Sequence, residues 1–336
     1  MTERRATERR TTEITGLHHV TAIAGDAQEN LDFYTGVLGM RLVKKSVNQD
    51  MPDTYHLFYA DAEGHPGSDL TFFPWPGRPH ARQGIGLAVE VALAVPPGSL
   101  AYWSERLAGL GIATGAPEVR RGERVLPATD PHGLPLALVE TDDRRDFAPW
   151  TTGPVPERWQ IRGLHAVRLW ERDLAATGSF LTGTLGFTAM GEESGWHRFG
   201  VTPADGALGG SGAHIELREL PDERRGAWGV GGVHHVAWRV PDEEAELAVR
   251  ERVAAARRRP TEVIDRFWFK SVYFLEPGGV LFELATEGPG FTKDESVTAL
   301  GEHLVLPPWL EPRRAKIEAE LPPLRPTIPT AEVSPQ

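Results

Sequence analysis

The sequence predicts an α+β protein made of four similar units, each a strand followed by a helix and then by further strands. The evidence is self-similarity within the chain. The passage GLHHVTA from Gly16 returns as GLHAVRL from Gly163, and both run in register into YTGVLGM and LTGTLGF. A glycine follows the last apolar turn in each case, at Gly39 and Gly186, as is typical of the end of a helix.

A second, fainter pair of repeats completes the set of four. GLAVEVALAVP ends at Pro96 and corresponds to GVHHVAWRVP, which ends at Pro241. Each leads into a helical pattern, SLAYWSERLAGLG or EEAELAVRERVAAA. Each then closes on a turn and a strand, DPHGLPLALVE from Asp130 or EPGGVLFELAT from Glu276, where proline and glycine set the backbone. The four units therefore start near residues 16, 84, 163 and 232.

A Pro-rich passage, TTGPVPERWQIRG, separates the second unit from the third. We therefore predict an N-terminal domain over residues 14–150, a linker over 151–162 and a C-terminal domain over 163–290. Residues 1–13 are polar and are expected to be a disordered tail. The Pro-rich tail 291–336 contains one short helical stretch, EPRRAKIEAEL, and is expected on the surface.

Composition excludes several classes of protein. The chain has no cysteine, so a metal site must use His, Asp, Glu or backbone oxygen. The net charge is −11 and no basic block is present, which argues against nucleic acid as a partner. No apolar run approaches the roughly 20 residues of a membrane span, and the N-terminus lacks the apolar core of a signal peptide. We predict a cytoplasmic protein.

Comparison of the repeats indicates three metal-ligating side chains: His19, His235 and Glu283. The corresponding positions of the other units hold Ala166, Glu90 and Ala137, and the first unit has Phe72 or Thr71 near the place of the glutamate. A histidine in a strand is often only a packed core residue, but here its repeat partner lacks the group. A glutamate inside an apolar strand is costly to bury without a cation or a donor. Glu90, His214 and Glu216 form a weaker mirror set, expected to be structural core with solvated acids.

Two imidazoles and one carboxylate leave about three positions open on an octahedral ion, as in the facial triad of non-haem Fe(II) oxygenases. The same donors also suit Mn(II), Co(II) and Zn(II), so ligand type alone leaves the metal undecided.

Four units in two pairs resemble the vicinal oxygen chelate superfamily, which includes glyoxalase, bleomycin-resistance and extradiol dioxygenase proteins. The resemblance implies βαβββ units, paired into open barrels in two tandem domains. Over roughly Ile14 to Phe291 the chain is similar to the hydroquinone 1,2-dioxygenases. Four stretches carry this resemblance: TGLHHVTAIAGDAQENLDFYTGVLGMRLVKKSVNQD, YHLFYADAEGHPGSDLTFFPWPG, GGVHHVAWRVPD and DRFWFKSVYFLEPGGVLFELATEGPGF. Many ring-cleaving relatives take all three ligands from the third and fourth units, an arrangement that Ala166 rules out here.

The resemblance also implies roles for individual residues. His19, His235 and Glu283 match the ligands of a metal that would be Fe(II), with Mn(II) as the second candidate. The expected catalytic residues are His18, Arg266 and Tyr273, which match residues that line the substrate pocket, and His234, which is next to a ligand. Because neighbours along a strand point to opposite faces, His18 and His234 should point away from the metal unless a bulge brings them back.

The predicted function is Fe(II)-dependent ring cleavage, in which both atoms of O2 enter a hydroquinone-type or catechol-type diol. The expected partners are the small aromatic diol and O2, and the chain could also form a homo-oligomer. One alternative is a non-oxidative metal enzyme, a glyoxalase-like isomerase or thiol transferase. Such sites usually recruit a fourth protein ligand, which Phe72 or Thr71 does not offer. A binding or sequestering protein is the other alternative, and the metal triad argues against it.

Overall fold

The computed structural model describes residues 13–142, 145–202 and 208–326, and in them four βαβββ units follow one another, as the repeats predict. The first unit comprises β1 (Gly16–Ala24), α1 (Ala27–Leu31), β2 (Arg41–Val47), β3 (Tyr55–Ala60) and β4 (Asp69–Pro74). The second comprises β5 (Ala88–Val95), α2 (Leu100–Gly109), β6 (Glu118–Arg120), β7 (Glu123–Thr129) and β8 (Pro135–Glu140). The third comprises β9 (Gly163–Glu171), α3 (Leu174–Gly183), β10 (Thr188–Glu193), β11 (Trp196–Gly200) and β12 (His214–Glu219). The fourth comprises β13 (Val233–Val240), α4 (Glu243–Ala255), β14 (Ile264–Asp265), β15 (Lys270–Leu275) and β16 (Leu281–Thr286).

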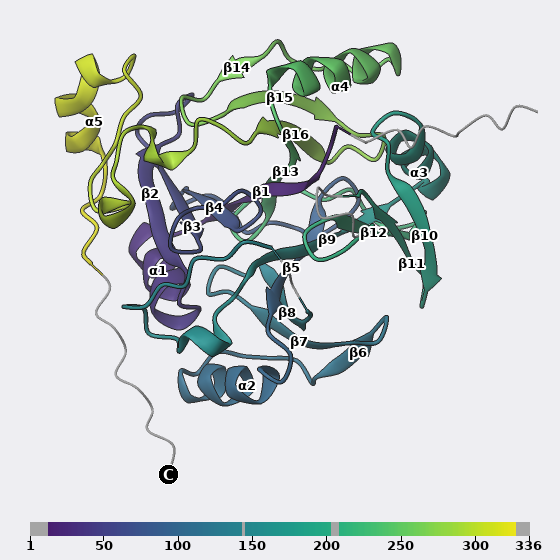
Figure 1. Ribbon diagram of the computed structural model, residues 1–336, viewed down its shortest axis with the longest axis horizontal. Helices are drawn as coiled ribbons and strands as arrows, with labels where there is room; N and C mark the ends of the chain where they lie inside the picture. The colour runs from purple at the N-terminus through teal and green to yellow at the C-terminus, as the bar shows by residue number, and fades with distance from the viewer. Residues whose placement is uncertain (1–12, 143–144, 203–207, 327–336) are drawn as a thin grey trace, which may run out of the picture.

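The strands form two mixed sheets of eight strands, and each sheet combines one unit from each half of the chain (Figure 1). The first sheet has the order β14-β15-β16-β13-β1-β4-β3-β2, so it joins the fourth unit to the first. The second sheet has the order β10-β11-β12-β9-β5-β8-β7-β6 and joins the third unit to the second. The central pairs, β1 with β13 and β5 with β9, are antiparallel. The opening and closing units of the chain therefore lie in one sheet.

Local signals in the sequence set the ends of the helices. Asp26 and Asp173 occupy the same place in their repeats, and each carboxylate accepts a hydrogen bond from a backbone N–H of the first helical turn. Helix α1 continues as a π-helical segment, Asp32–Val37, and ends before Gly39, where φ is +67°. Gly186 follows α3 with φ of +79°. The left-handed conformation at these two positions explains the glycines that end the predicted helices.

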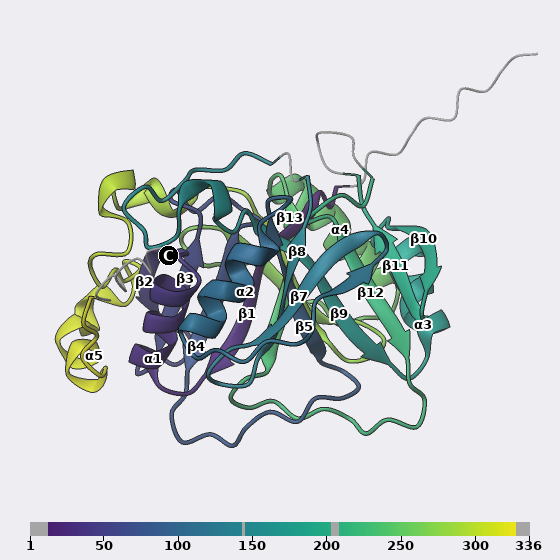
Figure 2. The same ribbon diagram turned by 90° about the horizontal axis from the view of Figure 1, so that it is seen from below.

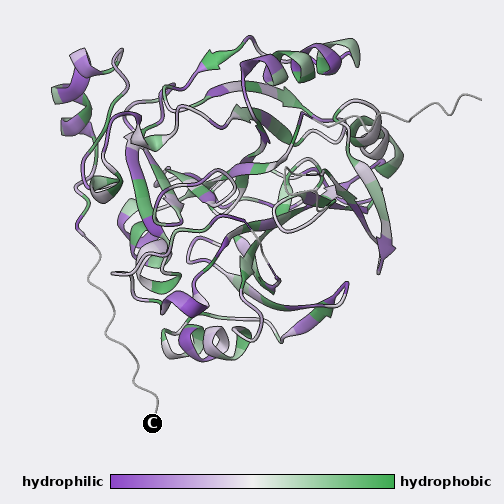
Figure 3. Ribbon diagram, viewed as in Figure 1, coloured by the Kyte–Doolittle hydropathy of each residue, from purple (hydrophilic) through white to green (hydrophobic). Residues whose placement is uncertain are grey.

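One large apolar core lies between the sheets and their covering helices and includes the buried Trp103 and Trp238. Helices α1 and α2 lie side by side, and Arg106 of α2 donates hydrogen bonds to the carbonyls of Gly36 and Val37 (Figure 2). Apolar residues run along the strands, whereas α4 alternates polar and apolar positions (Figure 3). In the part of the chain that the structure describes, no helix is long and apolar enough to cross a membrane.

The C-terminal segment packs against the first unit, where it appears in yellow beside β2 (Figure 1). Leu304 forms a β-bridge with Lys45, and the hydroxyl of Tyr55 donates to the carbonyl of Pro322. The helical stretch that the sequence predicts in this tail is present as α5 (Arg314–Glu320). The predicted disordered tail, except for Glu13, lies outside the described residues.

Two glutamates are buried together where α3 meets the turn between β15 and β16. Glu276 accepts hydrogen bonds from the backbone of Gly278 and Val280 and from the hydroxyl of Thr177. Neither carboxylate oxygen of Glu171 has a hydrogen-bond partner among the described residues. Burial, and then the negative charge of Glu276, raise the pKa of Glu171 from 4.5 to about 8. The fold therefore favours a protonated Glu171.

Because of this pair, we expect the free energy of unfolding to fall as pH rises. A carboxyl group whose pKa is raised in the folded state stabilises the fold fully below pH 4.5, and this stabilisation is lost as pH rises through about 8. The upper bound is about 5 kcal/mol, since one pKa unit corresponds to about 1.4 kcal/mol. We expect Glu171→Gln to remove much of the loss of unfolding free energy between pH 5 and pH 9, measured by urea denaturation. Glu105→Gln, at an exposed position of α2, is the control. Parallel pH profiles for Glu171→Gln and the native chain would contradict the assignment.

Candidate metal centre

The three predicted ligands converge on neighbouring strands of the first sheet. His19 lies on β1, His235 on β13 and Glu283 on β16, and all three side chains are buried. The two Nε2 atoms lie 3.2 Å apart. The Oε2 of Glu283 lies 3.3 Å from Nε2 of His19 and 3.0 Å from Nε2 of His235. His19 lies more than 200 positions before the other two ligands in the sequence, and the pairing of the first and fourth units brings the three together.

The chemistry of this donor set fits a cation. Oε2 of Glu283 is buried and has no hydrogen-bond partner among the described residues, whereas Oε1 accepts a hydrogen bond from the hydroxyl of Ser271 at 2.6 Å. Burial opposes ionisation of Glu283, but the imidazoles of His19 and His235 hold its pKa well below the usual value. An ionised carboxylate and two imidazole nitrogens that, within the described parts of the chain, contact mainly one another match a site for a divalent metal.

A β-bulge precedes each ligand histidine. In the pairing of β1 with β13, Leu17 faces Trp238 and His19 faces Ala237, so His18 is the extra residue. A second bulge leaves His234 extra on β13. A bulge breaks the alternation of side chains along a strand. As a result, the ring of each extra histidine turns toward the ligand histidine that follows it, with the two Nδ1 atoms 2.9 Å and 2.8 Å apart.

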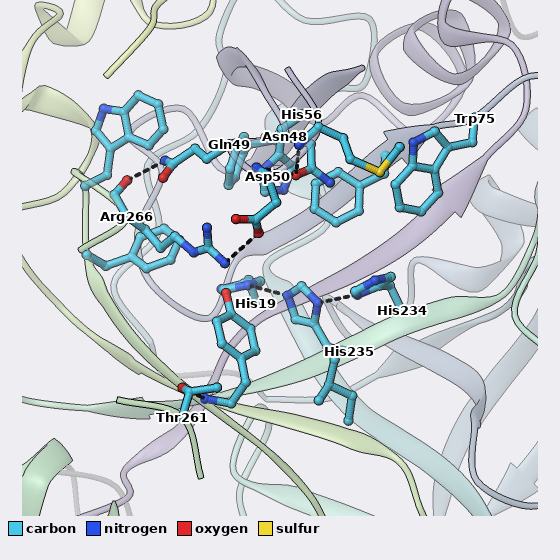
Figure 4. Close-up of a pocket in the computed structure, with 17 residues that line it drawn as sticks. His19, Asn48, Gln49, Asp50, His56, Trp75, His234, His235, Thr261 and Arg266 are labelled. Atoms are coloured by element: carbon cyan, nitrogen blue, oxygen red, sulfur yellow. Dashed lines mark hydrogen bonds and ion pairs between the residues drawn. The ribbon is translucent and has the colours of Figure 1, made fainter. Parts of the chain in front are cut away.

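The ligand histidines face a cavity of about 380 Å³, within the usual range for a small-molecule site (Figure 4). Its walls combine aromatic rings with a few polar groups. The first unit contributes Asn48, Gln49, Asp50, Met51, His56, Phe58, Phe73 and Trp75, and the fourth unit contributes His234, Thr261, Arg266, Trp268, Phe269, Tyr273 and Leu281. An aromatic substrate of modest size fits such a lining.

Arg266 and Tyr273 stand together in the cavity wall. The guanidinium carbon of Arg266 is 5.4 Å from the centre of the Tyr273 ring, and Nη2 lies 3.1 Å from a carboxylate oxygen of Asp50. Burial and the charge of Glu283 raise the pKa of Tyr273, with Arg266 opposing them. Tyr273 is therefore a protonated hydroxyl donor at neutral pH, and Arg266 supplies a positive charge beside it.

His18 and His234 occupy different surroundings despite their equivalent bulges. His234 lines the cavity and stacks on the ring of Trp228, with 4.8 Å between ring centres. His18 is not part of the cavity lining, and its Nε2 lies 3.2 Å from the carbonyl oxygen of Thr286. Three of the four expected catalytic side chains therefore face the cavity, and His18 does not.

Sequence reasoning missed His56. Its Nε2 lies 2.9 Å from the hydroxyl of Thr71, which in turn lies 2.7 Å from the hydroxyl of Thr21. The choice between Phe72 and Thr71 is thus resolved, because Phe72 belongs to the large core and Thr71 turns toward the cavity side. The available signal was alternation along YHLFYA, which places His56 on the same face as Phe58.

The second sheet has no comparable donor cluster among the described residues, and one expectation about it was wrong. Glu216 is 3% exposed and is not a solvated acid. It forms ion pairs with Arg168 at 2.7 Å and with Arg198 at 3.0 Å, and these arginines hold its pKa at about 2 despite burial. Glu90 likewise pairs with Arg120. The arginines and acids of the second sheet line one small space together with Ala92 and Ala166.

Comparisons with known proteins agree with this fold. A family model described as the glyoxalase/bleomycin resistance protein/dioxygenase superfamily matches residues 16–138 and 163–284. The chain therefore belongs to this superfamily, which the resemblance of its four paired units predicts.

Individual relatives cover nearly the whole chain. It is 43% identical to MhqE of Bacillus subtilis (strain 168), which is named a ring-cleaving dioxygenase, over 92% of this chain and 99% of the relative. It is 31% identical to the chlorohydroquinone/hydroquinone 1,2-dioxygenase of Sphingobium indicum, over 89% of this chain and 93% of the relative. The crystal structure of a protein described as a dioxygenase from Bacillus subtilis superposes with a TM-score of 0.88 and 38% identity, over 94% of this chain and 99% of the other.

Proposed function

We propose that this chain is an Fe(II)-dependent dioxygenase that cleaves the ring of a hydroquinone-type or catechol-type diol. The observation that carries the proposal is the buried cluster of His19, His235 and Glu283 at the wall of an aromatic-lined cavity. The names of the relatives support ring cleavage, and the similarity to a hydroquinone 1,2-dioxygenase supports the para-diol. Mn(II) is the second candidate for the metal.

A bound Fe(II) ion would supply open coordination positions and one-electron redox chemistry, which spin-forbidden reactions of O2 with an aromatic ring require. The residues of the chain would prepare the substrate. Arg266 would stabilise the negative charge of a deprotonated hydroxyl, and Tyr273 would donate a hydrogen bond to a substrate oxygen. His234 lines the cavity wall and would pack beside the bound ring. The aromatic walls would orient the ring and exclude water.

An oxygen electrode combined with metal analysis tests this function. Protein purified without oxygen and loaded with Fe(II) should consume one O2 for each hydroquinone or catechol, and no O2 without a diol. Mass spectrometry after reaction in 18O2 should find both labelled atoms in the ring-opened product. A metal-loaded protein that binds diols but consumes no O2 would refute the proposal and would favour a non-oxidative metal enzyme.

Arg266 should contribute to catalysis through its charge. We expect Arg266→Met to lower kcat/KM for the diol about 100-fold, because a buried donor beside a developing anion typically contributes that much. Steady-state oxygen uptake measures the effect. Arg314→Met is the control, since that guanidinium, at the start of α5, pairs at the surface with Glu311 and Glu318. A loss of less than about threefold in Arg266→Met would remove Arg266 from the mechanism.

A further inference from the structure

Two pairs of histidines share one unusual contact. His18 meets His19, and His234 meets His235, through their Nδ1 atoms at 2.9 Å and 2.8 Å. Both pairs have ring centres 5.1 Å apart and planes inclined at 82°. A hydrogen bond between two Nδ1 atoms requires one to carry the proton and the other to be bare.

The direction of the bond follows for the first pair. Nε2 of His18 lies 3.2 Å from the carbonyl oxygen of Thr286, and a carbonyl can only accept, so this Nε2 carries a proton. His18 is buried against Phe269, and it faces Nδ1 of His19, which must carry the proton of that ring if Nε2 of His19 is to bind a metal. Its Nδ1 is therefore bare. The shared proton must sit on Nδ1 of His19, which leaves the Nε2 lone pair of His19 free to face Glu283 and His235.

The second sheet provides an internal comparison. It has the same two bulges, occupied by His165 and Val89, and the residues that follow them are Ala166 and Glu90. No ligand imidazole follows either bulge, and the ring of His165 packs edge-on against His214 of β12, with ring centres 4.7 Å apart, rather than against a neighbour on its own strand. His165 instead contacts the hydroxyl of Ser211 at 3.1 Å and the carboxylate of Glu123 at 3.4 Å. The bulge is thus a feature of the fold, whereas the doubled histidine occurs only where an imidazole ligand needs a partner.

We propose that His18 and His234 are positioning residues, which accept the Nδ1–H of His19 and His235 and so orient each ligand ring with Nε2 toward the metal. This inference rests on the proposed metal centre, but it needs no oxygen chemistry. It replaces the expected role of His18 as a catalytic residue of the substrate pocket, since His18 does not line the cavity. His18 is held by a backbone carbonyl, and His234 is held by stacking on Trp228.

Cobalt binding tests the proposal without activity. The Kd for Co(II) is measured by chelator competition in the full chain. We expect His18→Leu, which keeps the packing against Phe269 but removes the acceptor, to weaken binding about 10- to 100-fold, the usual effect of losing a hydrogen-bond partner of a ligand. His18→Asn, whose side-chain oxygen can replace the Nδ1 acceptor, should recover most of the affinity. His165→Leu, at the matching bulge of the second sheet, should bind like the native chain.

Several outcomes would overturn the proposal. They are Co(II) binding by His18→Leu within twofold of the native chain, no recovery in His18→Asn, or a native chain that does not bind Co(II). A measurement on the native chain avoids any variant that fails to fold: in the Zn(II)-loaded protein, 15N shifts should show His18 as the Nε2–H tautomer. A proton on Nδ1 of His18 would equally refute it. A chain that passes these tests but consumes no O2 with diols would refute only the proposed function.

Discussion

Replacing Glu283 with alanine is expected to abolish both metal binding and diol-dependent oxygen uptake. The carboxylate is the only anion among the three ligands, and its Oε2 lies 3.0 Å and 3.3 Å from the two imidazole nitrogens. Without it, a divalent ion would keep two neutral ligands in a buried site, where uncompensated charge is costly. We expect the affinity for Fe(II) or Co(II) to fall by more than the roughly 100-fold that a residue behind a ligand contributes.

Metal content after dialysis and oxygen uptake with hydroquinone give the two readouts. Glu287→Ala is the matched control, because Glu287 follows the same strand but is 45% exposed and pairs with Arg239 at the surface. That variant should keep both the metal and the activity. Retention of either property by Glu283→Ala would mean that the ion is held elsewhere, and the assignment of all three ligands would fail with it.

The metal centre could be predicted by comparing the repeats, because each unit can be compared with a similar unit of the same chain. At each ligand position a second copy of the unit shows what the fold alone requires, and there Ala166 and Ala137 stand in place of His19 and Glu283. A ligand set divided between the first and last units also implies that these units pair, as the first sheet shows. The predicted boundaries of the two domains follow the sequence duplication, whereas each sheet crosses the linker between them.

From the sequence, the orientation of His18 and His234 could be predicted only on the condition that their strands contain no bulge. Alternation along a strand turns them away from the ligands, and two bulges reverse that result. A bulge depends on how two strands hundreds of residues apart align, and neither strand alone carries that information. His56 escaped notice for a similar reason, since its contact with Thr71 requires the pairing of β3 with β4.

The C-terminal tail was predicted as a surface segment, yet part of it neutralises a buried charge. Lys44 on β2 is fully buried, and its ammonium donates hydrogen bonds to Asp294, Glu295 and the carbonyl of Phe291. It lies 5.3 Å from the centre of the ring of Trp268, whose Nε1 also donates to Asp294. Because Trp268 forms part of the cavity wall, this contact connects the tail to the candidate site.

Lys44→Met is therefore expected to lower the free energy of unfolding by about 3–5 kcal/mol, since removal of the buried ammonium leaves the nearly buried carboxylate of Glu295 without its cation and leaves Asp294 with the indole of Trp268. Urea denaturation measures this, and Lys45→Met is the control, because Lys45 is only partly buried and donates to the carbonyl of Glu302.

Removing the positive charge and both negative charges at once should lower the free energy of unfolding by less. Lys44→Met combined with Asp294→Asn and Glu295→Gln leaves neutral groups at the same contacts, and we expect it to recover much of the loss. If Lys44→Met alone unfolds within about 1 kcal/mol of the native chain, the ion pairs contribute no more than surface pairs do, and packing of the tail against Trp268 must hold the cavity wall instead.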